Sequence, residues 1–234
     1  IFRLPSSHYY LLKSINHNRI TSEFGTNVLI DPNNPTDLRH FIESTYFSYV
    51  ELESKYELKK ILDIIVQARL NINFIELRAL NICSAIDLLR GKWSNLNRKS
   101  ETIEKNKFKN KYGKLKKVIA EFATTQLNAT DQQIEFMTRK VSELNRPPLN
   151  DILKMMILDI GADIPINDID SFKKNRDKLV HEASFATEND TEDFLTVLNF
   201  ADCLILSLLG YSGRYFDVRT HTIATINNNN PKHP

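Results

Sequence analysis

Three residues near the end of a predicted helix carry side chains suited to acid–base chemistry on a phosphodiester. They lie in the segment Arg176-Asp-Lys-Leu-Val-His181, which places Arg176 and Asp177 a few residues before His181. An imidazole accepts or donates a proton near neutral pH, and a guanidinium supplies a permanent planar charge that fits two phosphate oxygens. Together such groups can transfer a proton and stabilise negative charge that develops on an anionic substrate. The three residues are candidates for these roles.

The segment 168–182 is predicted to be helical, and Arg176 falls within its apolar stripe. Ile169, Phe172, Leu179 and Val180 form that stripe at about 100° per residue. An arginine in this position needs a partner, because an unpaired buried charge is costly. The candidate partners are the charged residues of the apolar helix predicted over 74–93, namely Glu76, Arg78, Asp87 and Arg90.

His181 points elsewhere, because it lies about 140° from Arg176 on an ideal helix. Asp177 shares the face of His181 and is predicted to hydrogen-bond its imidazole. Two interpretations follow. Either the residues form a catalytic site, or Arg176 pairs with an acidic residue of the bundle while His181 caps the helix end.

The elements that must position these residues are mainly helices. Helical patterns cover 36–55, 56–70, 74–93, 112–127, 130–145, 149–160, 168–182 and 191–209. The helix over 74–93 is the most apolar, which predicts a central position. Only 26–30 and 215–226 favour strands. The sequence therefore predicts an all-α fold, a helical bundle with about seven or eight helices and minor terminal strands.

Composition is that of an ordinary globular protein. The 234 residues are 41% hydrophobic and 26% charged, with a net charge of +2. There is no apolar run long enough for a transmembrane helix and no signal-peptide pattern at residue 1. Cys83 and Cys203 are predicted to be buried reduced thiols, which favours a cytoplasmic location. Cysteines and histidines lack metal-site spacing and no glycine-rich phosphate loop occurs, so we expect neither a metal nor a cofactor.

A basic segment over 94–111 follows the apolar helix. It contains five Lys, one Arg and two Glu. Charge pattern alone favours a solvated linker, and the alternative is contact with a phosphate backbone.

The motif resembles the signature of HEPN domains, in which an arginine and a polar residue precede a histidine by four to six positions. Arg176, Asp177 and His181 match that signature, with Asp177 where Asn is more common. The helix order over 36–215, ending in Leu-Leu-Gly-Tyr211, is similar to the Apea-like branch of the family. Residues 1–35 would then be a lead-in from a preceding domain, and 216–234 a C-terminal appendage.

The resemblance implies a metal-independent endoribonuclease of the defence or toxin type. It implies Arg176, Asp177 and His181 as catalytic residues, RNA as substrate, a 2′,3′-cyclic phosphate product and a homodimer with a composite site. The alternative is a catalytically inactive HEPN module that dimerises or senses RNA for a neighbouring domain.

Overall fold

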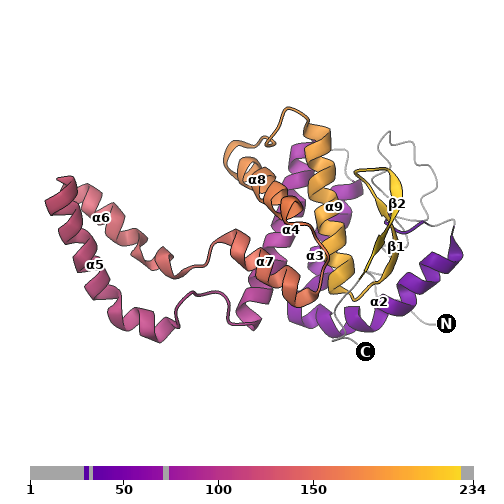
Figure 1. The fold of residues 1–234 in the computed structure, drawn as a ribbon, viewed down its shortest axis with the longest axis horizontal. Helices are drawn as coiled ribbons and strands as arrows, with labels where there is room; N and C mark the ends of the chain where they lie inside the picture. Colours follow the sequence, from indigo (N-terminus) through magenta and orange to yellow (C-terminus); the bar gives the residue numbers. More distant parts are fainter. Residues whose placement is uncertain (1–28, 32–33, 71–73, 228–234) are drawn as a thin grey trace. The chain divides into compact units, whose positions relative to one another are not determined.

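The computed structural model describes residues 29–31, 34–70 and 74–227, and it confirms the mainly helical fold (Figure 1). Most of the predicted strand over 26–30 and the first 28 residues lie outside this range. The chain forms two compact units, residues 1–93 with 153–234 and residues 94–152. Its helices are α2 (Pro35–Tyr56), α3 (Leu58–Leu70), α4 (Ile75–Leu96), α5 (Lys105–Leu127), α6 (Asp131–Arg139), the 3₁₀ helix η1 (Lys140–Asn145), α7 (Leu149–Ile160), α8 (Ile166–Glu182) and α9 (Asp190–Leu208).

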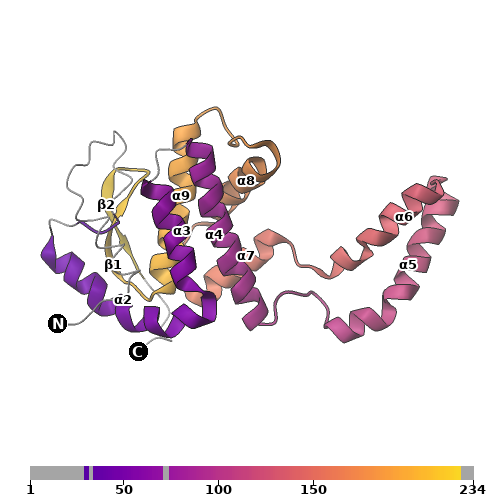
Figure 2. The same cartoon turned by 180° about the vertical axis from the view of Figure 1, so that it is seen from behind.

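Helix α9 is the central helix of the first unit. Fourteen of its 19 residues are buried, more than the single face that an amphipathic helix covers. Helix α8 packs on one side of α9 and the two-stranded sheet on the other (Figures 1 and 2). Neighbours on several sides therefore explain why α9 is mostly apolar from Phe194 to Leu208 and why its polar Asn199 and Asp202 are buried as well.

Helix α4 is buried along one broad face, and its exposed residues are Leu77, Ser84 and the last two of the helix. Ile82, Ile86 and Leu89 are fully buried, whereas Leu77 is 44% exposed and Ser84 is also exposed. The buried positions recur at helical spacing, and Leu77 and Ser84 fall outside that stripe.

The predicted strand over 215–226 is a hairpin that belongs to the first unit. Strands β1 (Gly213–Asp217) and β2 (Thr222–Ile226) pair antiparallel, with Tyr215 opposite Ala224. Tyr215 and Ile226 join a buried cluster with Tyr211, Ile30 and Phe41. The amide of Phe216 also donates to the carbonyl of Leu29 at 2.9 Å. These contacts tie the hairpin to both Leu29 and α2.

The second unit is a helical hairpin of α5, α6 and η1. A capping box at Thr130 and Gln133 starts α6, and the Thr-x-x-Gln spacing in the sequence is typical of this cap. The buried Asn145 donates to the carbonyl of Ile103 at 2.8 Å and accepts from its amide at 2.7 Å. Helix α5 begins at Lys105, so the predicted linker over 94–111 is wrong for residues 105–111.

Candidate functional site

Helix α8 carries all three residues of the motif. It ends at Glu182, and the next residue, Ala183, has a left-handed φ of 53° that stops the helix. Ile169, Phe172, Asn175 and Leu179 form its buried face. Val180 is 46% exposed, so the buried stripe is rotated toward Asn175 compared with the prediction. Arg176 consequently lies at the edge of that stripe, and its side chain is 22% exposed.

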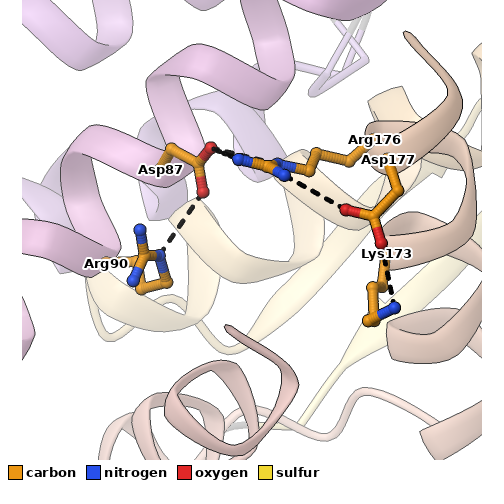
Figure 3. A network of polar contacts seen from close by, with 5 residues as sticks. All are labelled: Asp87, Arg90, Lys173, Arg176 and Asp177. Atoms are coloured by element: carbon orange, nitrogen blue, oxygen red, sulfur yellow. Dashed lines mark hydrogen bonds and ion pairs between the residues drawn. The ribbon is translucent and has the colours of Figure 1, made fainter. Parts of the chain in front are cut away.

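The guanidinium of Arg176 lies between two carboxylates (Figure 3). Its Nη2 and Nε donate to Oδ2 of Asp87 at 2.8 and 3.2 Å. Its Nη1 donates to Oδ1 of Asp177 at 3.1 Å. Asp87 lies on α4 and is one of the four candidate partners named from the sequence. The site therefore joins α4 to α8 through a charge-assisted contact.

Two further cations share these carboxylates. Lys173 donates to Oδ2 of Asp177 at 2.9 Å, and Nε of Arg90 donates to Oδ1 of Asp87 at 3.4 Å (Figure 3). With both carboxylates ionised, the network of Arg176, Arg90, Lys173, Asp87 and Asp177 has three positive and two negative charges. It therefore keeps a net charge of +1 although each carboxylate is paired.

The network shifts the pKa values of its members. Partial burial by itself lowers the pKa of Arg176, but its hydrogen bonds to Asp87 and Asp177 outweigh burial and raise that pKa. Burial raises the pKa of Asp177, but the hydrogen bonds from Lys173 and Arg176 outweigh it and lower that pKa. Both groups are therefore held in their charged forms.

His181 is exposed in the last turn of α8. Both oxygens of Asp177 contact Lys173 and Arg176, so the predicted hydrogen bond from Asp177 to the imidazole is wrong. Within the described part of the chain, no hydrogen bond or ion pair engages His181. The reason is that Lys173, one turn before Asp177, competes for the same carboxylate from the opposite direction. The imidazole of His181 is thus accessible to solvent, whereas the guanidinium of Arg176 is held in place by Asp87 and Asp177.

A second polar cluster fixes the loop that follows His181, and sequence reasoning missed it. Asn175 is 1% exposed, donates to Oδ1 of Asp193 at 2.9 Å and accepts from the amide of Ala186 at 2.9 Å. Oδ2 of Asp193 accepts from the amide and hydroxyl of Thr187, both at 2.8 Å. The available signal was an asparagine on the apolar face of α8, since a buried amide must be hydrogen-bonded.

The two cysteines are unpaired thiols. Burial raises the pKa of Cys83 to about 12, with Asp87 acting in the same direction. Burial likewise raises the pKa of Cys203 to about 12, although its side chain is only half-buried. Neither thiol is therefore a nucleophile at neutral pH.

In residues 29–31, 34–70 and 74–227, no group of three or more His, Cys, Asp or Glu side chains could hold a metal ion. Nor does any described helix have the length and apolar character to cross a membrane. Compared with models of protein families, with curated proteins and with solved structures, the chain matches none.

Proposed function

We propose that this protein is a cytoplasmic, metal-independent endoribonuclease of the HEPN type. One observation carries the proposal: α8 places the accessible His181 five residues after a guanidinium whose nitrogens are oriented by Asp87 and Asp177. His181 is assigned to proton transfer, and Arg176 to stabilising the phosphorane. The 2′-hydroxyl of the RNA is the nucleophile, so the 5′-oxygen leaves and a 2′,3′-cyclic phosphate forms.

The role proposed for Asp177 is to position Arg176. Its carboxylate contacts Nη1 and Asp87 contacts Nη2, which restricts rotation of the guanidinium. A phosphate that approaches the network encounters a net charge of +1, because Arg90 and Lys173 offset the two carboxylates. A guanidinium fixed in this way loses less conformational entropy when it binds an anion.

A homodimer would complete the site. Transesterification needs a base and an acid, and the one histidine of the motif, His181, supplies only one of them at a time. Two α8 helices related by a two-fold axis would bring two histidines and two arginines to one substrate. We therefore expect a mass of twice the 27.1 kDa of one chain in light scattering.

The test is cleavage of a single-stranded RNA by His181→Ala and Arg176→Ala variants in the presence of a chelator. We expect wild-type cleavage to persist with the chelator, to yield a 2′,3′-cyclic phosphate and to need the 2′-hydroxyl. Each variant should lose at least about 100-fold in rate, the usual size of an acid–base or charge-stabilising contribution. Lys174→Ala is the matched control, because Lys174 is exposed on the same helix outside the network. Full activity in both motif variants contradicts the proposal.

A second candidate is a non-catalytic HEPN module that dimerises or binds RNA for another domain. The observation that favours it is that Asp87 and Asp177 already occupy the guanidinium of Arg176. An ion pair of this kind also stabilises a helix–helix contact. Wild-type protein that dimerises and binds RNA, but leaves it intact under all metal conditions, would favour this candidate.

A further inference from the structure

The first half of α5 is an unusually basic helical surface. Residues 105–117 contain seven lysines and no acidic residue: Lys105, Lys107, Lys109, Lys111, Lys114, Lys116 and Lys117. Every one except the half-buried Lys116 is exposed. None has an ion pair to a described residue, and Lys116 covers the ring of Tyr112 at 4.8 Å. Their charges are therefore not neutralised by the protein itself.

The charge of the chain is divided between its two units. Residues 94–152 hold twelve Lys and Arg and seven Asp and Glu, a net charge of +5. The remaining residues carry −3, so the overall value of +2 conceals a basic unit. An excess of one sign on one surface attracts a partner of opposite sign.

Three lysines of α5 lie together on one side of the helix, away from its half-buried apolar side chains. Phe108, Tyr112 and Leu115 are half-buried on the face that packs with α6 and η1. Lys107, Lys111 and Lys114, which we name the lysine face, lie within about 60° of one another and are centred about 100° around the helix from that apolar face. From Lys107 to Lys114 the helix rises by roughly 10 Å, which allows several anionic groups to be contacted together.

We propose that the lysine face of α5 binds the phosphate backbone of single-stranded nucleic acid without reading its sequence. The proposal rests on the proposed function for its choice of RNA as the natural partner. Lysine ammonium groups are point charges on flexible stems, suited to phosphate contact rather than to bidentate base recognition. The exposed positions of 105–117 are Lys, Asn and Gly only, so this stretch has no apolar wedge for insertion into a lipid surface.

The experiment compares two triple variants of the whole chain. One replaces the lysine face, Lys107→Gln with Lys111→Gln and Lys114→Gln. The control removes the same charge from exposed lysines of the other unit, Lys55→Gln with Lys59→Gln and Lys60→Gln. Glutamine has nearly the helix propensity of lysine, so both variants should keep the wild-type circular dichroism. Binding is measured by fluorescence anisotropy on a labelled, single-stranded 2′-O-methyl oligoribonucleotide over a range of salt concentrations.

We expect the lysine-face variant to bind roughly 10- to 100-fold more weakly near 0.1 M salt. Its slope of log affinity against log salt should fall by about 0.7 for each lost contact, about 2 in all. The control should behave as wild type. Equal affinity and slope for all three proteins would overturn the proposal. The proposal would also be overturned if the lysine-face variant lost binding to anionic phospholipid vesicles while its binding to the oligonucleotide stayed unchanged.

The result is independent of catalysis. A 2′-O-methyl strand has no 2′-hydroxyl to attack, so the assay measures binding alone. If the wild-type protein binds the oligonucleotide more tightly than the lysine-face variant but does not cleave ordinary RNA, the nuclease proposal is rejected and the lysine-face proposal stands. If the wild-type protein cleaves ordinary RNA and the lysine-face substitutions do not change binding, the lysine-face proposal is rejected and the nuclease proposal stands.

Discussion

Arg176 illustrates how a single side chain links two helices. Its guanidinium is mostly shielded from solvent, yet it remains charged because Asp87 and Asp177 both accept its hydrogen bonds. A half-buried pair of this kind is sensitive to the loss of one partner, because the remaining charge is left without compensation. Lys173 and Arg90 reduce that sensitivity by sharing the carboxylates.

The pH dependence of stability should reveal the contribution of Asp177. Its pKa is lowered in the folded protein from the usual 3.8, so the folded state favours the ionised carboxylate. The stabilisation is present above pH 3.8 and is lost as the pH falls through the lowered folded pKa. Asp177→Asn should therefore show a shallower fall in melting temperature below pH 3.8 than wild type. An identical acid limb in thermal unfolding would contradict the assignment.

At the level of elements, polar clusters fix connections that apolar packing leaves free. The loop between α8 and α9 has few buried apolar side chains besides Phe185, and Asn175 and Asp193 hold its backbone. Asn189 caps α9 by accepting from the amide of Glu192. The path of the chain after His181 thus depends on hydrogen bonds more than on hydrophobic contacts.

Asn175→Ala should destabilise the protein by about 2 to 4 kcal/mol. The substitution leaves Oδ1 of Asp193 and the amide of Ala186 without their partners, at about 1–3 kcal/mol for each unsatisfied buried group. Asn189→Ala serves for comparison, since loss of an exposed N-cap costs about 1 kcal/mol. Urea unfolding gives both values. Equal losses in the two variants would mean that Asn175 is not a buried support of the loop.

Helix α4 offers a matched pair of substitutions that test its one-sided burial. Ile86 is fully buried, whereas Leu77 is 44% exposed on the same helix. Ile86→Asp should unfold the domain, because it places an unpaired charge in the core. Leu77→Asp should stay folded with a melting temperature within a few degrees of wild type. Circular dichroism melts distinguish the two, and a folded Ile86→Asp protein would show that the core is placed wrongly.

At the level of the whole molecule, the chain between Trp93 and Leu153 leaves the first unit and returns to it. This insertion has its own helices and a net charge opposite in sign to that of the rest. Among its described residues only a few, such as Ala123, Val141 and Asn145, are buried. It therefore has little core of its own, and its exposed surface is available for a partner.

Limited trypsin digestion should cut first, within the described residues, at Arg98 or Lys99. Both are exposed, Arg98 has a left-handed φ of 53°, and the segment between α4 and α5 has no helix or strand. Exposed irregular segments are preferred sites of proteolysis. Mass spectrometry of the early products identifies the cut. First cleavage inside α5, at Lys109 or Lys111, would instead show that this helix opens readily.

The sequence by itself determined the helical class, the position of α8 with Arg176 and His181, and the capping box at Thr130. These features depend on local periodicity and on hydrogen bonds over a few residues. The sequence also named four charged residues of the helix over 74–93 as candidate partners of Arg176, of which only Glu76 and Asp87 are acidic. It did not identify Asp87 among them, because 89 positions separate the two residues and helix packing decides which side chains meet.

Only the tertiary structure decided which groups compete for each carboxylate. Asp177 contacts Arg176 and Lys173 instead of His181, because three cationic or imidazole groups are within its reach along one helix. The burial of Asn175, the exposure of Val180 and the place of the β1–β2 hairpin beside α9 have the same origin. Each depends on which faces of neighbouring elements are covered, and that coverage is a property of the assembled fold.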